Sequence, residues 1–226
     1  MVRPKDLHSP TRSVASPVII QDRVWYLPSR ADASLFRFPG WVSAELFEKE
    51  APIMVEYCSG NGTWIAEKAV QNPHLNWLAV EIRFDRTRKI WSKIKNLNLK
   101  NLVVACAEGL SLSKNFFPPS SIHQIFVNFP DPWPKRRHAK HRIISPLFFS
   151  EAARTLEEEG LLTFVTDDEP YSTLFLELLP TLKVPLKQTN PSPGYKTPPD
   201  EYGTSFFDSL FRGQGKEIRY HELRKI

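Results

Sequence analysis

The segment that decides the fold of this 226-residue chain is Ile53-Met54-Val55-Glu56-Tyr57-Cys58-Ser59-Gly60-Asn61-Gly62. It begins with an apolar run of strand length, Ile53 to Glu56, and passes through Gly60 and Gly62 into a helix-like pattern. A strand that leads through a glycine loop into a helix is the opening unit of an open α/β sheet. Because such sheets bind ligands beyond the carboxyl ends of their strands, this loop predicts a ligand site.

Strand-like and helix-like segments alternate from this point onward. The expected strands are short apolar runs: Ile53 to Glu56, Trp77 to Val80, Leu102 to Cys106, Ile122 to Val127 and Leu161 to Val165. The expected helices lie between or after them: Asn61 to Gln71, Phe84 to Asn96, Pro146 to Glu158 and Glu169 to Leu179. This alternation predicts an α/β fold with a mostly parallel sheet and helices on both faces. The tail looks different, with an irregular proline-rich stretch, Pro185 to Tyr202, and then an expected strand pair, Phe206 to Phe211 and Ile218 to Leu223.

The chain divides into a short arm and one domain. Residues 1–40 carry several prolines and no clear periodicity, which predicts an N-terminal arm, extended or partly disordered,. Residues 41–226 are expected to form the domain, and a hydrophobic content of 41% is enough for its core,. The polar N-terminus lacks the apolar run of a secretory signal, and no apolar run is long enough to cross a membrane,.

The two cysteines, Cys58 and Cys106, lie in or beside expected strands. They predict small core residues with reduced thiols, no disulfide partner and a cytoplasmic location. Because no Cys or His pair has metal-ligand spacing, no metal site is expected.

Acidic residues mark the ends of the first three strands. Glu81 follows Gly62 by roughly 20 positions, where an acid commonly accepts hydrogen bonds from ribose hydroxyls,. Glu108 lies just past the third strand, where it would meet an adenine edge or be a solvated loop acid. Glu56 would repel a pyrophosphate, and Ile65 replaces the small residue of a dinucleotide fingerprint,. A cationic ligand such as S-adenosylmethionine is therefore favoured over NAD.

The sequence Asn128-Phe129-Pro130-Asp131-Pro132-Trp133-Pro134-Lys135-Arg136-Arg137-His138 follows the fourth strand. Its prolines restrict the backbone and are expected to hold Asp131 and Trp133 in extended geometry. A rigid acid and a flat ring beside cations suit a nucleic-acid base next to its phosphates. The alternatives are that Asp131 caps a turn and that Trp133 packs as a lid instead of stacking on a base.

The segment Asn128 to Pro134 is called the elbow, and positive charge is concentrated directly after it. The formal net charge of +5 is mild, but one short stretch contains Lys135, Arg136, Arg137, Lys140 and Arg142. A solvated loop would explain the cluster; a phosphate-contacting patch explains it better beside Asp131 and Trp133.

Together these features resemble the tRNA (guanine-N7)-methyltransferase family. The elbow is similar to the family signature NFPDPW-x-K-x-R-H, and Thr166-Asp167 after the fifth strand, with Tyr171 one helical turn on, is similar to its TD motif. The resemblance implies a Rossmann-like class I methyltransferase with a seven-stranded sheet. It also implies methyl transfer from S-adenosylmethionine to N7 of the variable-loop guanosine, position 46, of tRNA.

The resemblance also implies residue roles. Glu56, Glu81, Glu108 and Asp131 would contact S-adenosylmethionine, and Gly60 and Gly62 would shape its loop. Asp131 would be the catalytic residue, most simply by accepting hydrogen bonds from the guanine edge and stabilising the positive charge of the product. Lys135 and Asp167 would contact tRNA. Asp167 alone suggests either a contact to the base, a contact that orients Lys135, or an N-cap of the helix from Glu169.

Two departures from the family pattern stand out. Cys58 replaces a glycine of the first loop, and the Thr-x-aromatic-Glu motif of the tail fits in two registers, beginning at Thr204 or at Ser205. Three other functions remain open: a class I methyltransferase with another substrate, an inactive RNA-binding module, and a nicotinamide-dependent oxidoreductase. Nothing in the sequence indicates a homo-oligomer.

Overall fold

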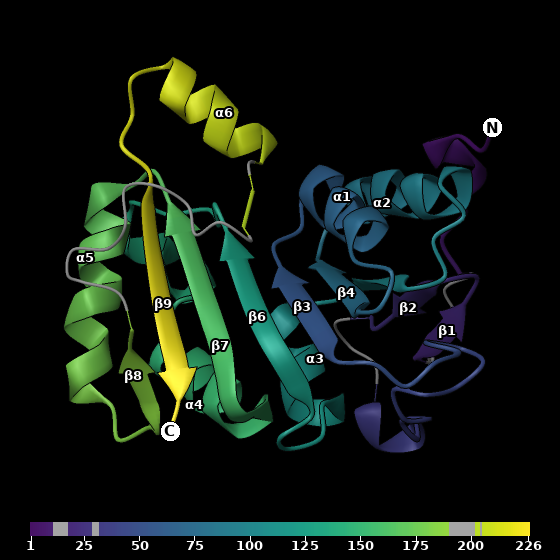
Figure 1. Ribbon diagram of the computed structural model, residues 1–226, viewed down its shortest axis with the longest axis horizontal. Helices are drawn as coiled ribbons and strands as arrows, with labels where there is room; N and C mark the ends of the chain where they lie inside the picture. Colours follow the sequence, from purple (N-terminus) through teal and green to yellow (C-terminus); the bar gives the residue numbers. More distant parts are fainter. Residues whose placement is uncertain (11–17, 29–31, 190–201, 204) are drawn as a thin grey trace. The chain divides into compact units, whose positions relative to one another are not determined.

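The computed structural model describes residues 1–10, 18–28, 32–189, 202–203 and 205–226 (Figure 1). They fall into two compact units, Met1–Phe117, called unit 1, and Pro118–Ile226, called unit 2. Most of the proline-rich stretch expected between Pro185 and Tyr202, namely residues 190–201, lies outside the described residues, as does Thr204.

The described strands of unit 1 form a mostly parallel set. They are β1 (Ile19–Gln21), β2 (Val24–Tyr26), β3 (Ile53–Tyr57), β4 (Asn76–Glu81) and β5 (Leu102–Cys106). Their order is β1-β2-β5-β4-β3, with only β1 antiparallel to its neighbour. Every residue of β3 and β4 is buried, so both faces of these central strands are covered, as in parallel sheets flanked by helices,.

Three helices belong to unit 1: α1 (Thr63–Gln71), α2 (Phe84–Asn96) and α3 (Gly109–Phe116). The predictions of α1 and α2 are confirmed, and α2 buries Ile90, Trp91 and Ile94 along one face, as its apolar spacing requires,. The helix α3 was not predicted. Its N-cap is Glu108, whose carboxylate accepts from the N–H groups of Leu110 and Ser111.

The described parts of the predicted N-terminal arm are joined to unit 1. β2 pairs in parallel with β5, and Arg88 Nε on α2 donates to the carbonyl of Leu7 at 2.7 Å. Asn96, at the end of α2, accepts from the N–H of Val2 at 2.7 Å. The boundary at residue 40 stays a prediction.

Unit 2 holds the rest of the described strands: β6 (Ile122–Asn128), β7 (Leu156–Thr166), β8 (Leu186–Gln188) and β9 (Arg219–Lys225). Their order is β6-β7-β9-β8, with β6 and β7 parallel and β9 antiparallel to both of its neighbours. Figure 1 shows β9 between β7 and β8. The end of β9 is fixed as well, since Lys225 Nζ donates to the carbonyl of Leu156 at 2.8 Å.

The helices of unit 2 are α4 (Pro146–Thr155), α5 (Glu169–Leu178) and α6 (Phe206–Gly213). The predicted strand from Phe206 to Phe211 is therefore wrong, whereas the strand predicted from Ile218 to Leu223 is confirmed as β9. The segment becomes a helix because Ser205 provides an N-cap, with its hydroxyl accepting from the N–H of Asp208,.

The core of unit 2 contains a buried histidine. His221 of β9 is fully buried, with its ring 5.7 Å from Phe164 and 4.9 Å from Phe175 between centroids. Its Nε2 atom lies 2.8 Å from Ser172 Oγ. Burial lowers the pKa of His221 to about 4, because the apolar surroundings disfavour the charged ring,.

The strand count differs from the expected seven. The strands β3 to β9 account for those seven, and β1 and β2 add two more among the described residues. The extra pair comes from the segment expected to lack regular structure. Its apolar residues, Val24 and Trp25, are fully buried, which explains why it joins the core of unit 1,.

Candidate active site

The glycine loop after β3 begins the cofactor side of the site. Gly60 and Gly62 both adopt left-handed backbone conformations, with φ of 56° and 67°. A side chain at Gly62 would also collide with α2, because its Cβ would lie 2.5 Å from Ile90 Cγ1. Both glycines thus favour the tight turn between β3 and α1, and Gly62 is the N-cap of α1,. The predicted glycine loop between a strand and a helix is confirmed.

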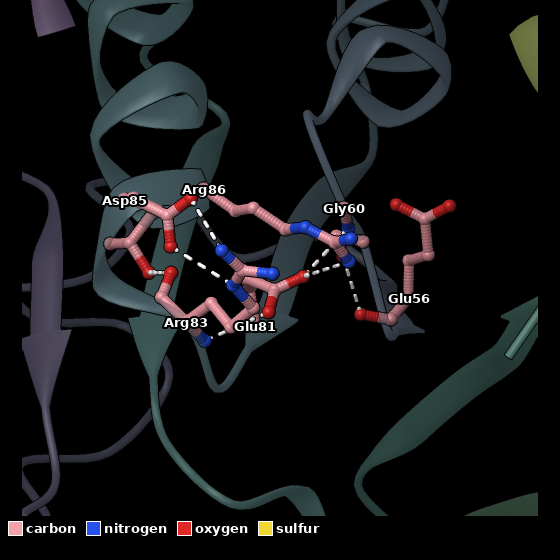
Figure 2. Close-up of polar contacts among 8 residues, drawn as sticks. Glu56, Gly60, Glu81, Arg83, Asp85 and Arg86 are labelled. Carbon is pink, nitrogen blue, oxygen red and sulfur yellow. Dashed lines mark hydrogen bonds and ion pairs between the residues drawn. The ribbon is translucent and has the colours of Figure 1, made fainter. Parts of the chain in front are cut away.

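Glu81 closes this loop from the end of β4 (Figure 2). Its Oε2 atom accepts from the N–H of Gly60 at 2.9 Å, and its Oε1 atom accepts from the N–H of Arg83 at 2.8 Å. Arg86 adds an ion pair at 3.9 Å. The Glu81 side chain is only 3% exposed, and burial raises its pKa, against the lowering effect of these donors. These hydrogen bonds fix the orientation of the Glu81 carboxylate and at the same time hold the glycine loop at Gly60.

Glu56 is the second buried acid of this loop. It lies in β3, is 3% exposed, and its backbone carbonyl accepts from Ser59 Oγ at 2.8 Å. In Figure 2 its carboxylate points away from the contact between Glu81 and Gly60. Two carboxylates thus lie at neighbouring strand ends, β3 and β4, as the sequence predicted.

Glu108, the third predicted cofactor acid, has a different setting. It is exposed and caps α3 through hydrogen bonds of 3.0 Å from Leu110 N and 2.7 Å from Ser111 N. Neither sequence interpretation, an adenine contact or a solvated acid, included this cap. The cap fixes the carboxylate beyond β5, and an adenine contact stays a prediction.

Cys58 occupies the position where the family pattern has glycine, and its backbone keeps a glycine-like conformation, with φ of 60°. A non-glycine residue in this region costs about 1 kcal/mol. Cys58 is exposed, so the prediction of a core residue is wrong for it, whereas Cys106 is half-buried; among the described residues neither cysteine forms a disulfide. Cys58 thus adopts the left-handed conformation that glycine favours,.

The elbow after β6 bears Asp131. Its backbone is strained, because Phe129 and Trp133 have φ of 47° and 44° in the left-handed region. A left-handed conformation costs each of these residues about 1–2 kcal/mol. Each residue also precedes a proline, which further limits its backbone conformation. The expectation of an extended Trp133 is therefore wrong, and contacts outside the elbow must compensate for the strain.

Asp131 is exposed at the turn of the elbow. Within the described part of the chain, its carboxylate makes no hydrogen bond or ion pair, so the alternative of a turn cap finds no support there. Phe129, two residues before Asp131, is held by two sets of contacts: its N–H donates to the carbonyl of Val165 at 2.9 Å, and its ring packs against Phe207 and Phe211 of α6. An acid presented in this way is available to a ligand.

The cations after the elbow divide into two groups. Lys135, Arg137 and Lys140 are exposed, as a phosphate-contacting patch requires. Arg142 instead points to the elbow and donates to the carbonyls of Pro132 and Trp133. The side chain of Arg136 lies outside what the structure describes.

The Trp133 ring joins a small aromatic cluster. It lies 5.5 Å from the His138 ring and 5.4 Å from the His141 ring between centroids. Arg137 Nε donates to His138 Nε2 at 3.2 Å. The Trp133 ring therefore packs against its own segment, and both interpretations, a lid and stacking on a base, stay predictions.

Asp167, at the end of β7, makes an ion pair with Lys216, a residue that the sequence did not single out. The N-cap of α5 is its neighbour Asp168, which accepts from the N–H of Tyr171 at 2.8 Å. The N-cap interpretation of Asp167 is therefore wrong by one residue. Lys216 gave no signal because its partner lies far away in the sequence.

For the tail motif, the structure describes the residues of the register that begins at Ser205, and the choice of register stays a prediction. Ser205 caps α6, and the buried Asp208 accepts from Arg212 Nε at 2.7 Å and from the hydroxyl of Tyr220. Thr204, which begins the other register, lies outside the described residues. Tyr202 donates its hydroxyl to Asn128 Oδ1 at 3.1 Å and so joins the tail to the start of the elbow.

The candidate residues thus form two groups. Unit 1 brings together the glycine loop, Glu56 and Glu81, and unit 2 brings together the elbow, its cations and Asp167. Among the described residues no cluster of His, Cys, Asp and Glu could hold a metal ion. Within the same residues, no helix has the length and apolar character needed to cross a membrane.

A family model described as a putative methyltransferase matches residues 50–206. Curated proteins named tRNA (guanine-N(7)-)-methyltransferase are similar over nearly the whole chain. One from Chlamydia muridarum is 40% identical over 225 residues, 99% of this chain and 98% of the relative. One from Chlamydia trachomatis is 42% identical over 230 residues, with the same shares. One from Staphylococcus aureus is 32% identical over 187 residues, 80% of this chain and 86% of the relative.

Solved structures share the fold at low sequence identity. The 16S rRNA methyltransferase KamB superposes with a TM-score of 0.55 and 15% identity, covering 79% of this chain and 89% of that chain. An rRNA methylase from Streptococcus thermophilus gives a TM-score of 0.51 at 15% identity, with the same coverage. The predicted fold class is confirmed.

Proposed function

The chain belongs to the tRNA (guanine-N7)-methyltransferase family, and on this premise we propose that it methylates N7 of the variable-loop guanosine, position 46, of tRNA. Its fold is the Rossmann-like class I methyltransferase fold of S-adenosylmethionine-dependent enzymes. The observation that carries the proposal is the exposed Asp131 on its strained elbow, next to exposed cations, in a chain that matches such enzymes from end to end. The cytoplasmic location expected from the sequence is part of the same proposal.

The residues of unit 1 fit S-adenosylmethionine. Glu56 and Glu81 are buried carboxylates at adjacent strand ends, which suit an ammonium group and ribose hydroxyls and would repel phosphates,. The left-handed turn at Gly60 and Gly62 brings the backbone close to whatever these acids hold,. Glu108 would contribute from the cap of α3, beyond the end of the next strand.

The cofactor supplies an electrophilic methyl group on a sulfonium. Guanine N7 has a lone pair in the ring plane and needs no deprotonation, so Asp131 has no proton to remove from it. Instead, Asp131 accepts hydrogen bonds from the N1–H and amino edge of the guanine and holds the base in line. When bound, S-adenosylmethionine would supply the methyl group to N7, and the Asp131 carboxylate would stabilise the positive charge that the purine acquires.

The exposed cations of unit 2 would bind the RNA backbone. Lys135, Arg137 and Lys140 would contact phosphates, and Arg136 is included on its charge alone,. Asp167, held by Lys216, would meet the substrate from the end of β7. The cofactor product would be S-adenosylhomocysteine, and no metal is required for this reaction.

The direct test is an incubation with methyl-labelled S-adenosylmethionine and unmodified tRNA, followed by complete digestion. We expect label in 7-methylguanosine and in no other nucleoside, and none when guanosine 46 is replaced by adenosine. Label in another nucleoside would retain the enzyme class and refute the target. Label in protein or small molecules alone would support a class I methyltransferase with another substrate. Tight RNA binding without transfer would indicate a binding module.

A further inference from the structure

Arg142 was expected to bind phosphate, but its guanidinium faces the elbow. Its Nε atom donates to the carbonyl of Pro132 at 2.8 Å, and its Nη2 atom donates to the carbonyl of Trp133 at 3.0 Å. The side chain is half-buried, unlike the exposed Lys135 and Lys140 of the same cluster. One planar group thus holds two consecutive carbonyls on the C-terminal side of Asp131.

The same guanidinium connects the elbow to the start of α5. It lies over the ring of Tyr171, 5.9 Å from the ring centroid,. Tyr171 is 2% exposed, its hydroxyl accepts from the N–H of Ile144 at 3.2 Å, and its own N–H donates to the carboxylate of Asp168, the N-cap of α5. Asp168 follows Asp167 directly in the sequence. Arg142 therefore joins the elbow, which carries Asp131, to the segment that carries Asp167.

The elbow needs such an external contact because of its composition. Pro130, Pro132 and Pro134 have no N–H group, so the elbow has few donors of its own with which to close a turn. Trp133 adopts φ of 44°, a conformation that persists only when surrounding contacts hold it,. The other end is held by Phe129, through Val165 and α6, and Arg142 holds the end after Asp131.

We propose that Arg142 is a positioning residue for the methyl transfer: it keeps the elbow in the shape that presents Asp131 to the guanine, and it does not bind tRNA phosphate. The inference rests on the proposed function. Lysine retains the charge of Arg142 but cannot hold two carbonyls with one planar fork, so Arg142→Lys separates the two roles.

The test compares four variants of the full chain: Arg142→Lys, Arg142→Ala, Lys140→Gln and Arg154→Lys. Lys140→Gln removes an exposed cation of the same cluster, and Arg154→Lys is the matched control, because this arginine lies on α4 and pairs with Glu151. For each variant, kcat, the KM for tRNA and the dependence of tRNA affinity on salt are measured, together with Tm.

We expect Arg142→Lys to lower kcat about tenfold, since small misplacement of reacting groups is costly, with unchanged tRNA affinity and salt dependence. Arg142→Ala is expected to behave in the same way and to leave the salt slope unchanged. Lys140→Gln should instead make the salt slope shallower and raise the KM for tRNA. Arg154→Lys should match the parent protein.

A second readout does not depend on activity. In protein labelled with 5-fluorotryptophan, the Trp133 resonance is assigned with Trp133→Phe. We expect this resonance to shift or broaden in Arg142→Lys and to remain unchanged in Arg154→Lys. The proposal is overturned if Arg142→Lys turns over at the parent rate with an unchanged Trp133 signal, or if Arg142→Ala makes the salt slope shallower by a full phosphate contact. Failure of the parent protein to form 7-methylguanosine would instead refute the proposed function.

Discussion

The acids of unit 1 and the acid of the elbow in unit 2 are presented in opposite ways. Glu56 and Glu81 are buried, and Glu81 is held by two backbone N–H groups of its own unit. Asp131 is exposed on a backbone that is itself strained. A buried, hydrogen-bonded acid suits a small ligand that displaces water from a fixed pocket, whereas an exposed acid suits a base presented by a large polymer. The predictions below test this difference.

The largest effect is expected from Asp131→Asn, which keeps the shape of the side chain and removes its charge. Loss of one electrostatic group at the developing charge typically lowers kcat by about 100- to 1000-fold. Binding of tRNA measured by equilibrium methods should change little, because the cations next to the elbow supply most of its affinity. Parent-like kcat in this variant would show that the charge of Asp131 is not used.

The pH dependence of stability should come mainly from unit 2, through His221. Its pKa is about 4 in the folded state, below the 6.5 of an exposed histidine, so the unfolded chain binds the proton first as the pH falls,. The contribution of His221 to the free energy of unfolding is therefore complete above about pH 6.5 and falls by about 3 kcal/mol as the pH approaches 4,. Glu81 in unit 1 acts in the other direction, because burial raises its pKa and acid relieves its buried charge.

Urea denaturation at a series of pH values would measure this effect. In His221→Gln the amide can still pair with Ser172. The loss of unfolding free energy at acid pH should then be smaller, with only the other titratable groups of the protein contributing to it. His74→Gln, at an exposed position, is the control and should retain the full loss. Equal acid sensitivity in both variants would exclude His221 as the cause.

A smaller effect is expected from Glu81→Gln. The amide group can accept only one of the two backbone hydrogen bonds and loses the charge that faces Arg86, so we expect affinity for S-adenosylmethionine to fall about tenfold,. Isothermal titration in the absence of tRNA measures this directly. Glu67→Gln, at an exposed position of α1, is the control in the same unit. An unchanged affinity would contradict the assignment of the loop to the cofactor.

The smallest effects should come from single cations of unit 2. Lys135→Gln and Arg137→Gln should each make the logarithmic salt slope of tRNA binding shallower by about 0.7–0.9, with kcat at saturating tRNA largely retained. Lys187→Gln, exposed on β8, is the control. Salt-independent binding by the parent protein would remove the phosphate patch from the site.

The fold could be predicted where the signal is local. The helices α1 and α2 and the strands β3 to β7 follow from apolar periodicity and from glycine and proline boundaries. The strands β1 and β2 could not be predicted, because each has three residues and β2 is stabilised by pairing with β5, far along the chain. The helix α6 had a usable signal, the Ser205-x-x-Asp208 capping pattern, which was outweighed by the apolar run around Phe207,.

The site shows the same limit. The acids at strand ends were predictable because parallel topology fixes where strand ends meet. The cap made by Glu108, the ion pair of Lys216 and the inward orientation of Arg142 were not, because a side chain's partner in space leaves no mark on its own position in the sequence. A cluster of cations therefore looks uniform in sequence although its members have different contacts.

The position of β9 bears on the order in which the protein is made. β9 follows β8 in the chain but lies between β8 and β7, so neither of them has this neighbour until the ribosome has produced residues 219–225. The strands of unit 1 are all complete by residue 106. A nascent or prematurely terminated chain can therefore assemble the strands of unit 1 while unit 2 still lacks β9, and such fragments should be recognised by proteases through unit 2.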